Sequence, residues 1–231
     1  MNDKYWIEFW KTYGASANDK DEHTQVLRTL NKKPISKDLW EFTLQKLDDV
    51  FFVKKNDRVL DLCSGNGLFS KHFVAKGASV VAVDISQDLL VKLDGIEEIQ
   101  TINSDIRDLD FENNSFDKII IYAGIQYLRN KETVQLLQVA YKWLKPGGVF
   151  FIGDIPDISK LWEFYNTKER QKIYFENLLS DASIVGNWYD SKWFEKLTRF
   201  IGFKECKTIV QDSKLIYSNF RFDFLCKKEN D

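Results

Sequence analysis

The stretch that decides the fold is Val59-Leu60-Asp61-Leu62-Cys63-Ser64-Gly65-Asn66-Gly67, a short apolar run that ends in a glycine-rich turn. Residues 68–76 follow it with helical spacing and stop before Gly77. The two glycines of the turn permit a sharp bend and the close approach of a ligand, because neither carries a Cβ. The first, unpaired N–H groups of the next helix open at the same place. The pattern predicts a ligand-binding strand–turn–helix unit or, as the plain alternative, only a tight turn.

Apolar runs recur along the chain and predict a layered fold. Residues 80–83, 99–103, 118–122 and 149–152 read as further strands, with helical segments between them. These runs are apolar throughout instead of alternating, which is typical of a parallel sheet covered on both faces. Strand–helix alternation with right-handed crossovers predicts an α/β, doubly wound fold. Residues 203–211 and 215–226 predict two last strands, which would form an antiparallel edge.

Two segments fall outside this alternation. Residues 1–57 are expected to be an N-terminal helical lid segment, in which Ser36 caps the second helix. Residues 58–231 form the predicted main domain, with an aromatic-rich helical insertion at about 157–201. The aromatic side chains of the insertion serve either as core beneath helices or as a stacking surface for a ring substrate. The aromatic helix around residues 5–10 is either part of the lid or a dimer contact, so a homodimer is one open outcome.

Composition and charge narrow the function. The chain has 231 residues, with 33 Lys and Arg against 35 Asp and Glu. This balance argues against a grip on nucleic-acid phosphates, which usually needs a basic excess. Three cysteines without a paired spacing, and two histidines, leave a metal site short of ligands. No run approaches the roughly 20 apolar residues of a membrane span, and the N-terminus lacks the layout of a signal peptide. We therefore expect a cytoplasmic protein with no metal and no membrane insertion, acting on a small molecule.

Acidic residues near the glycine turn indicate the kind of ligand. Asp84 ends the second strand, nineteen residues after Gly65, where a carboxylate can accept both hydroxyls of a ribose. The alternative role of Asp84 is to cap the following helix, although Ser86 is also available for that. Asp61, directly before the turn, would repel a pyrophosphate and suit an amino group instead.

A further acid follows the third strand. Asp105 is suited to an adenine amine, and Ile106 beside it to the adenine ring. Three acids around one glycine turn therefore predict a ligand with an amine, a diol and an adenine but no phosphate.

At this point residues 58–153 resemble the class I S-adenosylmethionine-dependent methyltransferases. Residues 59–67 match the family's glycine motif, Val81-Ala82-Val83-Asp84-Ile85-Ser86 its ribose-binding strand end, and Asp105-Ile106 its adenine site. Residues 116–124 resemble the fourth-strand motif and residues 143–150 the turn before the fifth strand. Cys63 departs from the pattern, since the family commonly has a glycine there. The resemblance implies a seven-stranded, mostly parallel sheet in the order 3-2-1-4-5-7-6, with strand seven antiparallel. It also implies S-adenosylmethionine as cofactor and S-adenosylhomocysteine as product.

The candidate residues fall into three groups. Arg28 is expected to pair with the cofactor's carboxylate and belongs to the cofactor-binding set: Tyr13, Arg28, Asp61, Ser64, Gly65, Asn66, Gly67, Asp84, Ile85, Asp105, Ile106 and Tyr122. Tyr122 is also a catalytic candidate, or an aromatic plug at the sheet end. The second catalytic candidate, His23, would take a proton from an alcohol, unless it is a plain surface histidine. The predicted substrate-binding residues are Gln126, Tyr127 and Asp154.

The sequence constrains the methyl acceptor less than it constrains the cofactor. Residues 122–125 lack the proline-containing segment with which base-amine methyltransferases grip a planar amine. A short resemblance of residues 25–36 to methyltransferases of bacterial surface-polysaccharide assembly favours the hydroxyl of a sugar or carbohydrate precursor. Three alternatives stay open: N-methylation of a metabolite or protein, a cofactor-binding module without turnover, and a nicotinamide dehydrogenase.

Overall fold

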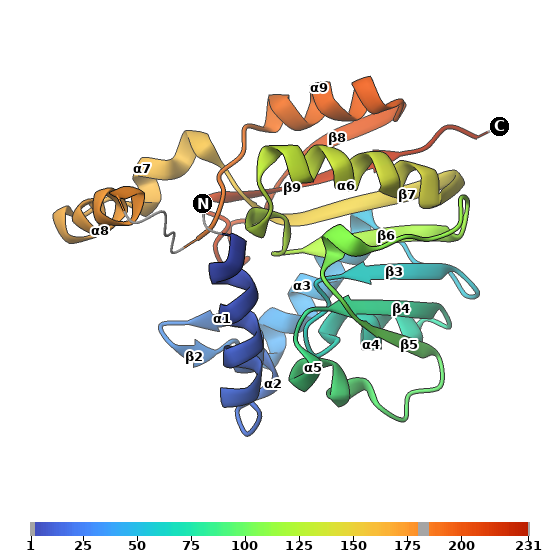
Figure 1. Cartoon of the computed structure of the whole chain (residues 1–231), viewed down its shortest axis with the longest axis horizontal. Helices are drawn as coiled ribbons and strands as arrows, with labels where there is room; N and C mark the ends of the chain where they lie inside the picture. Colours follow the sequence, from blue (N-terminus) through green and yellow to red (C-terminus); the bar gives the residue numbers. More distant parts are fainter. Residues whose placement is uncertain (1–2, 180–184, 231) are drawn as a thin grey trace.

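A computed structural model of the chain describes residues 3–179 and 185–230, with the side chains from residue 5 onward. One sheet organises the described residues. Its seven strands are β3 (Arg58–Leu62), β4 (Ser79–Asp84), β5 (Ile99–Asn103), β6 (Phe116–Tyr122), β7 (Leu144–Pro156), β8 (Glu205–Val210) and β9 (Arg221–Lys227). They lie in the order β5-β4-β3-β6-β7-β9-β8 (Figure 1). Strands β3 to β7 pair in parallel, and β9 runs antiparallel to both of its neighbours. Counted within the sheet, this is the predicted order 3-2-1-4-5-7-6, so the fold prediction is confirmed.

Helices cover both faces of the sheet because the strand residues are apolar on both sides. Val59 and Ile120 belong to a core shared with α3 (Lys37–Val50), α4 (Leu68–Ala75) and α5 (Gln87–Leu90). Their chain neighbours Leu60 and Ile119 belong to the opposite core, shared with α6 (Asn130–Trp143) and α9 (Ser191–Ile201). Successive strand residues therefore point into different cores, as the pleat requires. None of the described helices is long and apolar enough to cross a membrane.

The connection between β7 and β8 carries the predicted helical insertion. It contains the 3-10 turn η4 (Ile158–Lys160), α7 (Leu161–Phe164), α8 (Lys168–Leu179) and α9, while residues 180–184 lie outside the described part. The remaining 3-10 turns are η1 (Val91–Leu93), η2 (Ile106–Asp108) and η3 (Ile125–Tyr127). Figure 1 shows α7 and α8 projecting beyond the sheet at the end where α1 also lies.

The N-terminal segment is less helical than expected. It contains α1 (Asp3–Ser16) and α2 (Glu22–Gln25), and then a two-stranded hairpin of β1 (Thr29–Leu30) and β2 (Lys33–Pro34). The hairpin turns at Asn31 and Lys32, whose φ angles of 52° and 62° are typical of the tightest hairpin turn. Asn-Lys is a weaker turn signal than Asn-Gly, so the sequence pattern does not predict this hairpin. Ser36 does cap α3, since its Oγ accepts a hydrogen bond from the Leu39 N–H at 3.3 Å.

The last strand is shorter than predicted. It begins at Arg221 and not at residue 215, because residues 215–220 form turns in which Tyr217 has a φ of 67°. The Tyr217 hydroxyl donates a hydrogen bond to the Thr29 carbonyl at 2.8 Å. The turn before β9 is thus fastened to the N-terminal hairpin. Both segments lie at the end of the sheet where β3, β4 and β6 terminate (Figure 1).

Candidate cofactor and acceptor site

The glycine turn connects β3 to α4 in a left-handed backbone. Cys63, Gly65 and Gly67 have φ angles of 56°, 57° and 76°. A non-glycine residue pays a steric cost in this region, which explains why the family pattern has glycine at the position of Cys63. A Cβ on Gly65 would lie 2.6 Å from Cγ1 of Val26, so a side chain of the N-terminal segment lies against the turn.

Asp84 is bound directly to that turn. The Gly65 N–H donates to Oδ2 at 2.8 Å and the Ser86 N–H donates to Oδ1 at 2.9 Å. Burial raises the pKa of Asp84, and these backbone hydrogen bonds oppose the rise. Each carboxylate oxygen keeps acceptor capacity, so both can still receive a ligand hydroxyl. The expectation that Ser86 would cap α5 was wrong, because its side chain makes no capping bond and Asp84 takes the Ser86 N–H instead.

Asp61 is a buried acid with one side-chain partner. It is 2% exposed, and its Oδ2 accepts a hydrogen bond from the Ser70 hydroxyl at 2.6 Å. Burial, together with the negative charge of Asp84, raises its pKa to about 7. A cation that comes close to the Asp61 carboxylate would favour its charged form. The amino group of an amino-acid ligand supplies such a cation.

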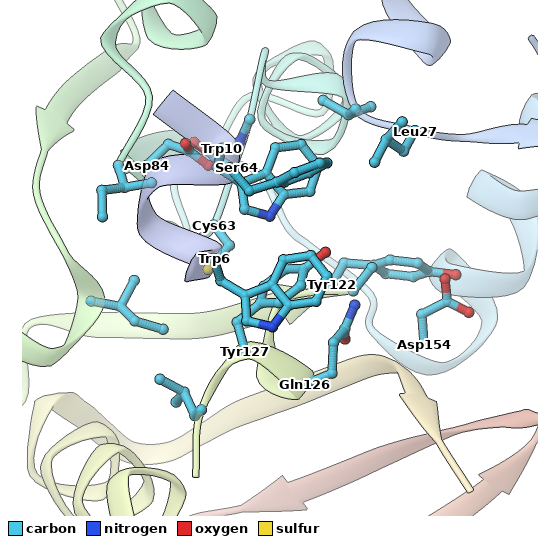
Figure 2. A pocket seen from close by; sticks show the side chains of 18 of the residues that line it. Trp6, Trp10, Leu27, Cys63, Ser64, Asp84, Tyr122, Gln126, Tyr127 and Asp154 are labelled. Atoms are coloured by element: carbon cyan, nitrogen blue, oxygen red, sulfur yellow. Dashed lines mark hydrogen bonds between the residues drawn. The ribbon is translucent and has the colours of Figure 1, made fainter. Parts of the chain in front are cut away.

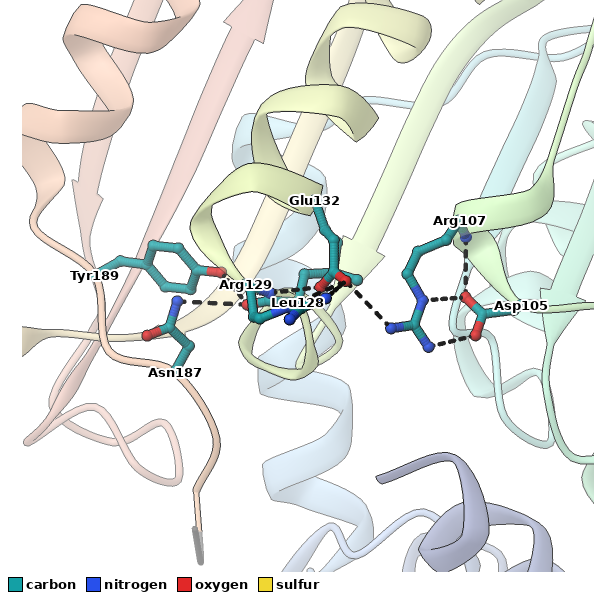
Figure 3. Close-up of polar contacts among 7 residues, drawn as sticks. All are labelled: Asp105, Arg107, Leu128, Arg129, Glu132, Asn187 and Tyr189. Carbon is teal, nitrogen blue, oxygen red and sulfur yellow. Dashed lines mark hydrogen bonds and ion pairs between the residues drawn. The ribbon is translucent and has the colours of Figure 1, made fainter. Parts of the chain in front are cut away.

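The third acid has a partner that the sequence did not reveal. Arg107 donates from its backbone N–H at 3.0 Å and from Nε at 2.9 Å to Oδ1 of Asp105, and from Nη2 to Oδ2 (Figure 3). Burial would raise the pKa of Asp105, but the hydrogen bonds and charge of Arg107 hold it below its usual range. Arg107 also contacts Glu132 at 3.5 Å. An adenine amine at Asp105 would therefore share the carboxylate with Arg107, and that role stays a prediction.

The glycine turn and the three acids line one cavity of about 580 Å³ at the carboxyl ends of the strands. In the view of Figure 2, Asp84 and Asp154 lie at opposite ends of the pocket, with the rings of Trp6, Trp10 and Tyr122 between them. Most of the predicted site residues line it: Arg28, Asp61, Ser64, Gly65, Asn66, Asp84, Ile85, Asp105, Ile106, Tyr122, Gln126, Tyr127 and Asp154. The side chains at 61, 84 and 105 thus share one cleft.

Three predicted residues lie outside the lining. The Tyr13 hydroxyl donates to the Thr24 carbonyl at 2.6 Å, which ties α1 to α2. The His23 ring packs against Trp40 with centroids 5.3 Å apart, and burial lowers its pKa. Gly67 faces the side chain of Leu93. The structure therefore gives these three residues places in the framework around the cavity, and it does not bring His23 to the site of a proton transfer.

Arg28 is a buried cation without a counter-ion among the described residues. It is 7% exposed, and its guanidinium lies over the ring of Tyr122 at 4.7 Å, with Trp40 and Phe69 also close. Its Nε has no hydrogen-bond partner. A buried guanidinium is costly unless an anion pairs with it, and a carboxylate matches its geometry. The prediction that Arg28 receives a ligand carboxylate fits this environment.

Tyr122 forms the wall between the two ends of the cavity. Its ring packs on Phe69 with centroids 4.6 Å apart. Burial, and then the charge of Asp154, raises the pKa of Tyr122 far above its usual range. The phenol is therefore protonated at neutral pH and can donate a hydrogen bond, but it does not serve as a base there.

The sequence reading missed part of the wall. Trp6 lies against Tyr127 with ring centroids 4.6 Å apart, and Trp10 lies 5.9 Å from the same ring. Both tryptophans come from α1 and line the cavity. The aromatic spacing of that helix marked it as buried but could not say against what. The Oε1 atom of Gln126 is buried without a partner, which leaves an acceptor for a ligand donor.

Comparisons with known proteins agree with this geometry. Residues 59–148 match the family model described as a methyltransferase domain. This part of the chain is therefore similar to methyltransferase domains. The site fits S-adenosylmethionine, because Asp61 and Asp84 line the cavity as buried acids and the Nε of Arg28 has no hydrogen-bond partner. When bound, the cofactor supplies an electrophilic methyl group on a sulfonium.

Relatives of the methyltransferase domain include a demethylmenaquinone methyltransferase from Clavibacter sepedonicus, 37% identical over 120 residues. The match covers 47% of this chain and 47% of that protein, so the chain aligns with about half of its relative's length. A ubiquinone/menaquinone biosynthesis C-methyltransferase from Haemophilus ducreyi is 27% identical over 67% of this chain and 68% of its own. Among solved structures, phosphoethanolamine N-methyltransferase 1 of Haemonchus contortus aligns with a TM-score of 0.70 and 16% identity, over 100% of this chain and 50% of its own. That likeness concerns the fold alone.

Proposed function

We propose that this chain transfers a methyl group from S-adenosylmethionine to a small, aromatic or otherwise largely apolar acceptor. The observation that carries the proposal is the single cavity that joins the Asp84-bound glycine turn to an aromatic chamber walled by Trp6, Trp10 and Tyr127. A nucleoside held at the glycine turn leaves the other end of the cavity for the acceptor. In-line transfer needs little more than alignment and exclusion of water, and an aromatic chamber under a lid supplies both.

Each end of the cofactor has a matching group. Asp84 would accept the ribose hydroxyls, Asp61 the amino group and Arg28 the carboxylate. Ile106, 8% exposed and lining the cavity, would lie against the adenine. Among the described residues of the cavity lining, no cluster of cations stands at the turn to hold a pyrophosphate, and this favours the adenosyl amino acid over a dinucleotide.

The proposed acceptor differs from the sugar hydroxyl that the N-terminal resemblance favoured. A sugar exposes many hydroxyls that each need a polar partner, and beside Gln126, Asp154 and Arg221 the acceptor end is walled mainly by aromatic and aliphatic side chains. Two of the relatives point the same way, since they are named as a demethylmenaquinone methyltransferase and a ubiquinone/menaquinone biosynthesis C-methyltransferase. An acceptor with an apolar ring fits this chamber better than a carbohydrate. N-methylation of a metabolite or protein stays an alternative that the experiment below separates.

Residues 1–57 act in this proposal as a lid over the cavity. A Cβ on Gly14 would lie 2.1 Å from the Ser86 hydroxyl, so α1 approaches the start of α5 closely at a position that tolerates no side chain. The same helix supplies Trp6 and Trp10 to the chamber. A cytoplasmic location and a homodimer stay predictions, and light scattering tests the dimer.

The experiment has two parts. Isothermal titration of the purified full chain with S-adenosylhomocysteine, and separately with NADH, tests cofactor choice. We expect binding of the first only, and binding of NADH instead would overturn the proposal. Methyl-labelled S-adenosylmethionine is then incubated with naphthohydroquinone, catechol, methyl glucoside, ethanolamine and the protein itself. Label in an aromatic product supports the proposal, whereas label confined to the glucoside, the amine or the protein contradicts the acceptor class.

A further inference from the structure

Two carboxylates from different strands meet at the acceptor end of the cavity. Asp154, near the end of β7, is 2% exposed, and Asp223 of β9 is 7% exposed. The Asp154 backbone N–H donates to Oδ1 of Asp223 at 2.7 Å. The Gln211 side chain joins them, because its Nε2 donates to Oδ1 of Asp223 at 2.7 Å and to Oδ1 of Asp154 at 3.2 Å. Of the two acids, Asp154 lines the cavity.

The backbone of Asp154 is held in an unusual conformation. Its φ is 62°, and the pairing of β7 with β9 shifts register between Ile152 and Ile155. Such irregularities redirect a side chain, and they persist only where the surroundings determine them. Here the Arg221 guanidinium, on the neighbouring strand β9, donates a hydrogen bond to the Asp154 carbonyl. The regular pairing of β7 with β9 is therefore interrupted at Asp154, whose carboxylate lines the acceptor end of the cavity.

Charged groups from several elements face this pair. Nη1 of Arg221 lies 4.0 Å from Oδ2 of Asp154. The positive charge of Arg28 also reaches this region, since it opposes the rise that burial causes in the pKa values of Asp223 and of Tyr122. Burial, and then the negative charge of Asp154, raises the pKa of Asp223 to about 7, against the effect of its hydrogen bonds. Near neutral pH, Asp223 therefore carries a proton part of the time. Two cations, one neutral phenol and a partly protonated neighbour surround Asp154.

We propose that Asp154 is the proton acceptor for an acidic hydroxyl of the acceptor, a phenol or hydroquinone, with Asp223 and Gln211 as its positioning residues. This inference rests on the proposed methyl transfer. The acceptor's O–H bond breaks and its proton passes to a carboxylate oxygen of Asp154. The electron pair left on the oxygen forms the bond to the methyl carbon. If a ring carbon conjugated with that oxygen forms the bond instead, this carbon then loses its hydrogen as a proton and the carbonyl oxygen takes up a proton, which restores the aromatic ring. The carbon–sulfur bond breaks, and its electron pair stays on the sulfur as a neutral thioether.

Acidity argues for a phenol over an alcohol. A phenolic hydroxyl such as that of tyrosine titrates near pH 10, whereas a water-like hydroxyl titrates near pH 16. Carboxylates are weak bases, so proton transfer from a phenol is about six orders of magnitude less unfavourable than from an alcohol. Arg28 and Arg221 would also stabilise the phenolate that forms. The remaining candidates for a base do not compete, because Tyr122 stays protonated and His23 lies outside the cavity lining.

The test compares the wild-type chain with Asp154→Asn, Asp223→Asn and the control Asp94→Asn, which changes an exposed acid outside the cavity lining. Asparagine tolerates the left-handed backbone of Asp154, and at 223 it keeps an oxygen for both donors, so the fold should survive. We measure the affinity for S-adenosylhomocysteine, the affinity of the cofactor-free protein for 4-nitrophenol at pH 6, and kcat and KM for naphthohydroquinone across pH.

We expect Asp154→Asn to lower kcat at least a hundredfold and to weaken 4-nitrophenol binding about tenfold, with S-adenosylhomocysteine affinity unchanged. Asp223→Asn should retain turnover, but the change in kcat/KM that accompanies the ionisation of Asp223 near pH 7 should disappear from its pH profile, because residue 223 no longer acquires a negative charge beside Asp154. A merely structural role would leave the profile in place. Asp154→Asn turnover within threefold of wild type, an unchanged profile, or no turnover of the phenol by protein that binds S-adenosylhomocysteine would overturn the inference. Failure to bind S-adenosylhomocysteine would instead overturn the proposed function.

Discussion

Replacing Asp84 by alanine should weaken cofactor binding in a way that the structure makes quantitative. The carboxylate is buried, holds the Gly65 and Ser86 N–H groups at 2.8 and 2.9 Å, and keeps acceptor capacity on both oxygens. Removing it takes a charged acceptor from the ligand diol and leaves two backbone donors of the turn without their partner. Hydrogen bonds to a charged group contribute about 1.5–3 kcal/mol. The dissociation constant for S-adenosylhomocysteine should therefore rise about ten- to 150-fold.

The assay is isothermal titration with S-adenosylhomocysteine at pH 7.5 on Asp84→Ala, Asp84→Asn and the surface control Asp94→Ala. The asparagine variant keeps one oxygen for the Gly65 N–H and loses the charge, so its affinity should fall between those of wild type and alanine. Circular dichroism and thermal melting check that each variant is folded. A folded Asp84→Ala protein whose affinity stays within twofold of wild type would refute the assignment of the diol site.

Three further perturbations test other parts of the site. Arg28→Met should raise the dissociation constant for S-adenosylhomocysteine at least tenfold in titration. It should not lower the melting temperature, because it removes a buried cation that forms no ion pair among the described residues. A loss of stability with unchanged affinity would contradict this role. Gly14→Leu should displace α1 and weaken binding several-fold, whereas Ala15→Leu on the exposed face of the same helix should not; equal affinities would count against the lid. The pKa of Asp223 is about 7 in the folded chain, above its unfolded value, so the folded state binds more protons between about pH 4 and 7, and the free energy of unfolding should fall as pH rises through that window. Chemical denaturation of Asp223→Asn should show a shallower fall, with the rest contributed by Asp61, and an unchanged slope would refute the assignment.

The sheet was predictable because its signals are local. Each strand of the parallel core is a short apolar run, and Gly65, Asp84 and Asp105 stand at fixed positions relative to those strand ends. Since parallel strands end at one edge of a sheet, such residues meet without any detail of packing being known. That Gly65, Asp84 and Asp105 line one cavity followed from this rule.

The acceptor end could not be predicted in the same way. Asp154, Asp223 and Gln211 come together through the antiparallel pairing of β7 with β9 and the shift in its register, which no local pattern encodes. The partner of Asp105 was missed because an acid and Arg107 two residues later are also a common surface pattern. The His23 ring turns to Trp40, which lies 17 residues later at the start of α3, and no local pattern in the sequence indicates that contact.

The most direct measurement is a crystal structure of the full chain with S-adenosylhomocysteine. The account predicts the ribose hydroxyls on Asp84, the amino group beside Asp61 and the sulfur directed towards the aromatic chamber that leads to Asp154. Density for the ligand at another surface, or in this cavity with its ribose away from Asp84, would contradict it.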